Sequence, residues 1–263
     1  MKTPLIILSK DRPNQLIRML ESIVPYMDNI RLIVCDNAST DTGMMAAYEK
    51  IKDLGGILIK NGMEMGFYGF NPGLKLFGKS KYFFLSDPDI VLGGSMPKDW
   101  VDILASIMDH HAVPKIGPAL SIKFSVSNRF TQRINHCEGK NWERPYIIDG
   151  VEDRCYCAPI DTTLAMYRRD TYTAWADSKP LFKPEMFSGV DQISQEIYNP
   201  KYDELFKMAP CFKTGCIRIA GRFTAEHTGW DVENKYTDEN EYYYNRCNKV
   251  LASTIRWRKE NRV

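Results

Sequence analysis

The first 120 residues alternate short apolar runs with stretches of helical periodicity, and this alternation restricts the fold more than any other feature. Strands that alternate with helices form βαβ units, so we predict a mostly parallel α/β sheet flanked by helices. Asp11 is expected to cap the first helix, and Ser39 or Thr40 the second. The expected strands are 4–8, 31–35, 57–60 and 82–86, and the expected helices are 13–23, 44–54, 70–78 and 100–108.

Polar side chains follow each of these four strands. They are Ser9, the pair Asp36-Asn37, Asn61 and Asp87. Open α/β sheets bind their ligands at the carboxyl ends of the strands. Core packing does not require polar residues at four separate strand ends, so the pattern predicts a nucleotide-binding crevice there.

The fourth strand is followed by the motif Asp87-Pro88-Asp89. Burying carboxylates without a partner costs several kcal/mol, so a role in the core is excluded. Mg²⁺ and Mn²⁺ prefer oxygen ligands and commonly use one or two carboxylates together with phosphate oxygens. An ordinary turn also accommodates Asp-Pro-Asp. Next to the other polar strand ends, the motif predicts a site for a metal and a diphosphate.

Composition limits the class of protein. The 263 residues are 44% hydrophobic, enough for the core of one large domain or two small ones. A net charge of +2, with acids and bases interspersed, gives no sign of nucleic-acid binding. Six basic residues between 246 and 262 fit either a solvated helix face or peripheral contact with anionic lipid.

The seven cysteines show no zinc-finger spacing, which favours reduced thiols in a cytoplasmic protein. The apolar run at residues 1–9 is too short for a signal peptide, and no apolar stretch of 18 residues follows it. We therefore expect a soluble protein, or at most a peripheral membrane protein. Beyond residue 120, strands are expected at 157–167 and 216–220 and helices at 193–198 and 239–256.

Three motifs follow the second, third and fourth expected strands. They are Asp36-Asn37-Ala38-Ser39-Thr40-Asp41, the segment 61–73 with Asn61, Gly66, Gly69, Asn71 and Gly73, and Asp87-Pro88-Asp89. In order and spacing they resemble the nucleotide-sugar half of GT-A glycosyltransferases of the family-2 type, and a looser resemblance continues over residues 160–169 and 225–230. The resemblance implies one GT-A-like domain over 1–263, with a donor-binding half at 1–95 and an acceptor-binding and catalytic half at 96–263.

The resemblance also implies roles for individual residues. Asp87 and Asp89 would hold Mn²⁺ or Mg²⁺ together with His227, which lies in the stretch Ala225–Trp230. Asp36 would bind the base or ribose; the structural alternative is an aspartate that makes an Asx-turn or caps the following helix. The expected contacts to the nucleotide sugar are Ser9, Arg12, Asp36, Asn37, Asn61, Gly66, Asn71 and Asp87.

An inverting transfer needs a carboxylate that takes the proton from the acceptor hydroxyl. Asp191 stands where similar enzymes place this base, although the chain has Val190-Asp191 instead of the commoner Glu-Asp pair. A helix cap is the structural alternative for Asp191. Asp161, at the head of an apolar run, is the second catalytic candidate.

Together these features predict an enzyme, an inverting, metal-dependent hexosyltransferase. Its donor would be a UDP-, GDP- or dTDP-sugar and its acceptor a glycan or other saccharide. One alternative is a sugar nucleotidyltransferase, but the residues after the first strand, Ser9-Lys10-Asp11-Arg12, lack the glycine-rich loop that grips a triphosphate. Another is a non-catalytic carbohydrate-binding protein on the same fold.

Overall fold

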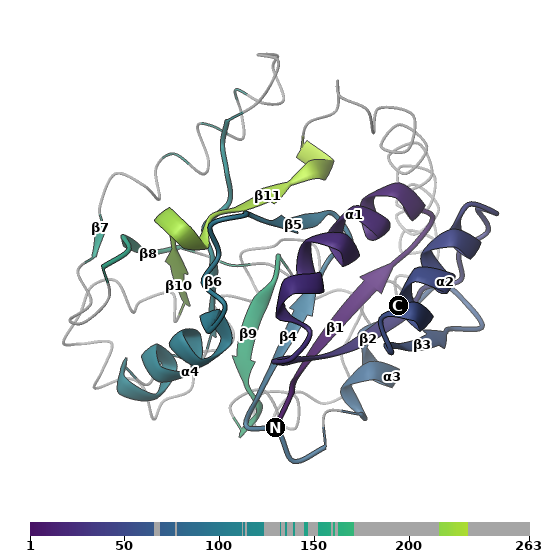
Figure 1. Ribbon diagram of the computed structural model, residues 1–263, viewed down its shortest axis with the longest axis horizontal. Coiled ribbons are helices and arrows are strands. Elements are labelled where there is room, and N and C mark those ends of the chain that lie inside the picture. Colours follow the sequence, from purple (N-terminus) through teal and green to yellow (C-terminus); the bar gives the residue numbers. More distant parts are fainter. Residues whose placement is uncertain are drawn as a thin grey trace, which may run out of the picture.

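The computed structural model describes residues 1–65, 69–76, 78–111, 113, 115–123, 132, 135, 139, 145–146, 152–158, 160, 163–170 and 216–230. Its centre is a nine-stranded sheet with the strand order β3-β2-β1-β4-β9-β6-β10-β8-β7 (Figure 1). Within this sheet β9 and β8 run against the other strands, so the sheet is mostly parallel, as predicted. The strands are β1 Thr3–Ser9, β2 Ile30–Asp36, β3 Ile57–Lys60, β4 Tyr82–Ser86, β6 Lys115–Pro118, β7 Pro145–Tyr146, β8 Cys155–Cys157, β9 Ala165–Arg168 and β10 Cys216–Ile219.

A second, two-stranded sheet pairs β5 (Ile90–Leu92) with β11 (Ala225–His227) in antiparallel fashion. The helices are α1 Pro13–Ile23, α2 Met44–Asp53, α3 Asn71–Leu74 and α4 Trp100–His111, with 3₁₀ turns η1 Val24–Tyr26, η6 Gly221–Phe223 and η7 Thr228–Trp230. Of the described helices, none combines the length and the apolar character needed to cross a bilayer.

The core lies on both faces of the nine-stranded sheet because side chains alternate along each strand. Leu5 and Ile7 of β1 face a cluster that includes the apolar faces of α1, α2 and α4. Ile6, between them in the sequence, faces the opposite cluster with Phe70 and Leu74 at α3. The central strands are covered on both faces, and this explains why they appear in the sequence as continuous apolar runs.

The strands expected at 4–8, 31–35, 57–60, 82–86 and 216–220 and the helices expected at 13–23, 44–54 and 100–108 match the structure closely. The helix expected at 70–78 is reduced to the four residues of α3. The expected strand 157–167 is instead two strands, β8 and β9, and Leu164 between them has a left-handed backbone with φ of 57°. Strands β5, β6, β7 and β11 were not predicted. The helices expected at 193–198 and 239–256 lie outside the described residues.

The predicted helix caps are wrong. Arg12 is the N-cap residue of α1 and Gly43 that of α2, and neither cap has a side-chain hydrogen bond. Asp11 uses its carboxylate elsewhere: Oδ1 accepts hydrogen bonds from the backbone N–H groups of Thr40 and Asp41 at 2.6 and 2.8 Å. Asp11 therefore ties the β1–α1 connection to the β2–α2 connection.

Candidate functional site

The carboxyl ends of β1, β2 and β3 meet at one edge of the sheet. Ser9 pairs with Asp36 in the parallel register, and Asp36 pairs with the last residue of β3, Lys60. The ladder extends past the strands, because Asn37 N–H donates to Ser9 O and Asn61 N–H donates to Asp36 O, both at 2.8 Å. The structure thus brings together Ser9, Asp36, Asn37 and Asn61, as predicted from the strand ends.

Two buried polar atoms at this edge accept no hydrogen bond from any described residue. They are Ser9 Oγ and Asp36 Oδ1, on side chains that are almost completely buried. The other carboxylate oxygen of Asp36 accepts a hydrogen bond from Ser39 N–H at 3.0 Å, three residues on, whereas an Asx-turn would use the N–H two residues on. Asp36 therefore holds the β2–α2 connection through Oδ2, and Oδ1 has no hydrogen-bond partner among the described residues.

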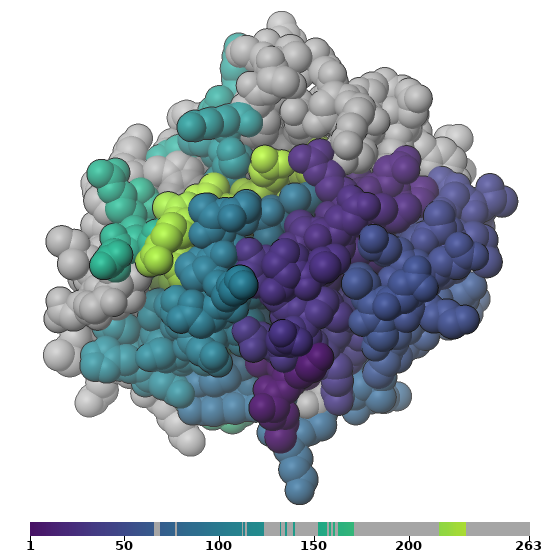
Figure 2. Space-filling view, in the orientation of Figure 1, coloured from purple at the N-terminus to yellow at the C-terminus, as the bar shows by residue number. Residues whose placement is uncertain are grey.

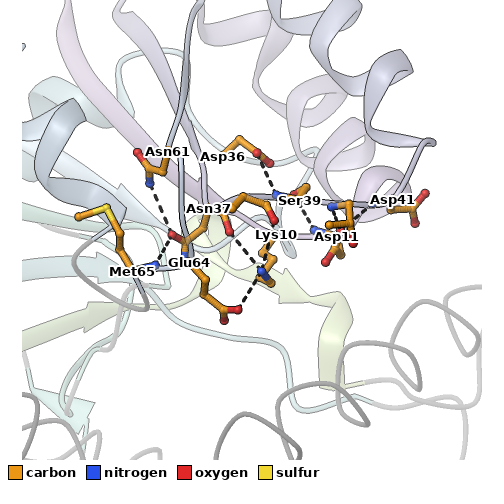
Figure 3. Close-up of polar contacts among 11 residues, drawn as sticks. Lys10, Asp11, Asp36, Asn37, Ser39, Asp41, Asn61, Glu64 and Met65 are labelled. Atoms are coloured by element: carbon orange, nitrogen blue, oxygen red, sulfur yellow. Dashed lines mark hydrogen bonds and ion pairs between the residues drawn. The ribbon is translucent and has the colours of Figure 1, made fainter. Parts of the chain in front are cut away.

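The loop after β3 is held over these strand ends by side chains from neighbouring connections (Figure 3). Asn37 Oδ1 accepts a hydrogen bond from Met65 N–H at 2.9 Å. Lys10 Nζ donates to the carbonyl oxygens of Asn37 and Ala38 and forms an ion pair with Glu64 at 2.9 Å. The β1, β2 and β3 connections are therefore fixed relative to one another.

Two glycines of the 61–73 segment have a packing role that the sequence did not suggest. A Cβ at Gly69 would overlap Leu8 Cδ1, and a Cβ at Gly73 would overlap Ile6 Cγ2. Both glycines let the backbone approach the sheet closely. Asn71 begins α3 on the same face, and Gly66 lies outside the described residues.

The two carboxylates of Asp87-Pro88-Asp89 differ in their surroundings. Asp87 is half-buried, whereas Asp89 is only 1% exposed. Asp89 immediately precedes β5, so the strand pairing of β5 determines what comes near it. Its Oδ1 atom accepts no hydrogen bond from a described residue.

His227 reaches Asp89 through the small sheet. β11 pairs with β5 so that His227 lies opposite Ile90. Thr228 then anchors the chain, because its N–H and its hydroxyl both donate to the backbone carbonyl oxygen of Asp89, at 2.8 and 3.0 Å. His227 Nδ1 lies 3.6 Å from Asp89 Oδ2. The structure thus brings Asp89 and His227 together, whereas their expected role as metal ligands stays a prediction.

Arg12 contributes a second charge to Asp89. Its Nη1 atom lies 2.5 Å from Asp89 Oδ2, and both side chains are buried. Burial alone would raise the pKa of Asp89, but the charges of His227 and Arg12 outweigh it and hold the pKa below its ordinary value. Asp89 is therefore an ionised carboxylate within a buried, positively charged pocket.

The segment that carries His227 lies against α1. Arg18 of α1 forms an ion pair with Glu226 of β11 at 3.1 Å, across 208 residues of sequence. In the space-filling view the yellow-green segment borders the purple α1 on the surface (Figure 2). The Arg18–Glu226 pair is partly solvent-exposed and is expected to contribute little energy, so Thr228 is the contact that anchors residues 225–230 at Asp89.

Gly229 allows the backbone of η7 to come close to Asp89, and replacing this glycine tests that geometry. A Cβ at Gly229 would overlap Asp89 Oδ2 and lie 3.2 Å from His227 Cε1. We expect Gly229→Ala to displace these side chains, lower the free energy of unfolding by about 1–3 kcal/mol and weaken divalent-cation affinity about 10–100-fold. Chemical denaturation and Mn²⁺ titration measure the two effects.

Gly94→Ala is the matched control, because a Cβ at this exposed glycine meets no atom within 4 Å. It should leave both quantities unchanged. Equal behaviour of the two variants would contradict the close approach of the η7 backbone to Asp89.

The residues around Asp89 fit a divalent cation with few protein ligands. Within the described part of the chain, no three His, Cys, Asp or Glu side chains are grouped closely enough to hold a metal. Asp89 offers an unpaired buried oxygen and His227 an imidazole nitrogen, a donor set that suits Mn²⁺. Such a cation would take its remaining ligands from water, Asp87 or a bound phosphate.

Two predicted catalytic residues, Asp161 and Asp191, lie outside the described residues. The sequence did not indicate that three residues lie next to Asp89. They are its ion-pair partner Arg12, Thr228 and Gly229. A glycine two residues after a histidine was visible in the sequence. Its significance depends on the β5–β11 pairing, which the sequence did not indicate.

The fold resembles solved structures. One is TarS residues 1–349 from S. aureus, with a TM-score of 0.50 and 16% identity, covering 75% of this chain and 55% of that one. Another is GalNAc-T7 with UDP, GalNAc and Mn²⁺, with a TM-score of 0.50 and 11% identity, covering 86% of this chain and 44% of that one. This chain has the GT-A fold.

The GT-A assignment confirms the fold predicted from the three motifs. The chain spans about half the length of the two solved structures. No protein-family model matches the sequence, and a search of the curated proteins finds no match. The assignment to the family-2 type therefore stays a prediction.

Proposed function

We propose that this protein is an inverting glycosyltransferase that moves a sugar from a nucleoside-diphosphate donor to a saccharide hydroxyl. One observation carries the proposal: in a GT-A fold, the buried Asp89 of Asp87-Pro88-Asp89 meets His227 at the edge of the sheet. Four polar strand ends lie along the same edge, where open α/β sheets bind nucleotides.

Residues 1–95 form the donor half in this proposal. Asp36 Oδ1 and Ser9 Oγ are buried hydrogen-bonding groups without a partner among the described residues, and they suit the base or ribose of a nucleotide. Asn37 and Asn61 make hydrogen bonds to Met65 and Gly69, in the segment that follows β3. Residues 96–263 supply the acceptor site and the base, with Asp191 first and Asp161 second.

The proposed cofactor is Mn²⁺ or Mg²⁺, held by Asp89 and His227, with Asp87 as a further candidate ligand. A divalent cation, when bound, acts as a Lewis acid that stabilises the charge growing on the departing diphosphate. The GalNAc-T7 structure contains UDP and Mn²⁺ together, which supports this pairing of ligands. Asp191 or Asp161 would take the proton from the attacking hydroxyl.

We further propose a cytoplasmic location, the compartment where thiols stay reduced. Cys35 and Cys155 are free and buried. Burial raises the pKa of Cys35 to about 11 and that of Cys155 to about 12, so both remain protonated thiols at neutral pH.

A thermal-shift screen tests the donor class. UDP-, GDP- and dTDP-sugars are added with and without Mn²⁺, and one nucleotide is expected to raise the melting temperature by about 5–10 °C at a hundredfold excess over its Kd. The shift should require Mn²⁺. Absence of a shift with every donor would leave a non-catalytic protein on the GT-A fold as the better description.

A further inference from the structure

The carboxylate of Asp89 already has a counter-ion within the protein. Arg12 Nη1 lies 2.5 Å from Asp89 Oδ2, and the side chains are 8% and 2% exposed. A carboxylate so deeply buried requires positive charge close by, because water no longer solvates it. Arg12 provides this charge in the protein without ligands.

Arg12 is well placed to respond to a ligand at the sheet edge. It occupies the N-cap position of α1, immediately after β1, and its side chain makes no capping hydrogen bond. β1 is the parallel neighbour of β4, which leads into Asp87-Pro88-Asp89. The Arg12–Asp89 pair therefore links the residues that follow two adjacent parallel strands, β1 and β4.

A divalent cation and Arg12 compete for the same carboxylate. Arg12 and His227 both face Oδ2, and only Oδ1 lacks a partner among the described residues. A cation bound at Asp89 would lie close to a guanidinium in a buried site, where like charges repel strongly because the effective dielectric constant is low. The negative charges of a diphosphate would relieve this repulsion.

We propose that Arg12 is a counter-ion latch: it excludes a divalent cation from Asp89 until a nucleoside diphosphate supplies the negative charge that both cations require. This inference rests on the proposed function. Once the diphosphate is bound, the guanidinium can donate to phosphate oxygens, for which its planar fork is suited. Metal and nucleotide binding are then positively coupled, and the coupling is reciprocal.

The direct test measures Mn²⁺ binding without nucleotide, from the EPR signal of free Mn²⁺. Arg12→Gln removes the charge and keeps an N–H donor for Asp89, so the carboxylate stays hydrogen-bonded. We expect this variant to bind Mn²⁺ alone about 10-fold or more tightly than the wild-type chain. Unchanged or weaker Mn²⁺ binding by the folded variant would overturn the latch.

Two further variants serve as matched controls. Arg12→Lys keeps the positive charge and should bind Mn²⁺ alone as weakly as the wild type. Arg18→Gln removes an arginine of α1 that pairs with Glu226 and not with Asp89, and it should also behave as wild type. Tighter Mn²⁺ binding by Arg18→Gln, equal to that of Arg12→Gln, would attribute the effect to net charge and overturn the latch.

If Arg12→Gln does not fold, the coupling between nucleotide and metal binding can be measured on the wild-type chain. UDP, GDP and dTDP affinity is determined by calorimetry with and without Mn²⁺, and the nucleotide that binds should do so about 5–150-fold more tightly with the metal. Equal affinities would overturn the latch. A chain that binds no nucleoside diphosphate under either condition overturns the proposed function as well, whereas coupled binding with an unaltered Arg12→Gln overturns the latch alone.

Discussion

Asp89→Ala is expected to abolish metal-dependent nucleotide binding. The substitution removes the buried carboxylate that faces His227, and with it the proposed anchor of the cation. It also leaves the buried guanidinium of Arg12 without a counter-ion, so the free energy of unfolding should fall by about 3–5 kcal/mol. Calorimetric titration of nucleotide with and without Mn²⁺, below the melting temperature of the variant, measures the first effect.

Asp153→Ala is the control for this experiment, because it breaks another aspartate–arginine pair, one in which the arginine is exposed. Asp153 Oδ2 lies 2.8 Å from Nη2 of Arg222, in the region of β8 and η6. This variant should lose stability and still bind nucleotide in a Mn²⁺-dependent manner. Retained Mn²⁺-dependent affinity in Asp89→Ala would show that Asp89 is not a metal ligand.

Asp191→Asn is expected to reduce turnover by about 10²–10⁴-fold with unchanged nucleotide affinity. The amide cannot accept the proton of the attacking hydroxyl, whereas the donor site is left intact. Steady-state kinetics with the donor found in the thermal-shift screen give the turnover, and calorimetry gives the affinity.

The comparison that decides between the two candidate bases uses Asp161→Asn under the same conditions. Near-normal turnover in Asp191→Asn, with an inactive Asp161→Asn, would assign the base to Asp161. Asp102→Asn is the control, since this exposed carboxylate lies in the first turn of α4 and should not affect the reaction.

The first half of the fold could be read from the sequence because its signals are local. Strands β1, β2 and β4 are covered on both faces, so each is a continuous apolar run. Helix α1 places Leu16, Met19, Leu20 and Ile23 on one buried face at helical spacing. Strands β5, β7 and β11 have only two or three residues, too few for a periodic pattern.

Local rules failed where distant groups compete for the same side chain. Asp11 has the composition and position of a helix cap, yet its carboxylate accepts hydrogen bonds from Thr40 and Asp41 N–H, 29 and 30 residues away. Ser39 likewise accepts a hydrogen bond from Asp11 N–H and does not cap α2. Both side chains join two connections at the edge of the sheet, and sequence proximity does not encode that link.

The chemical groups at the ends of the parallel strands could be read from the sequence, because strand periodicity and the polar residues that follow are local properties. Ser9, Asp36, Asn61 and Asp87 were identified in this way. The resemblance implied that His227 lies near Asp89, but the contact of Arg12 with Asp89 became apparent only in the tertiary structure, since it depends on the β1–β4 register. Charge compensation at a buried carboxylate is a property of three-dimensional packing, and Arg12 lies 77 residues from Asp89 in the sequence.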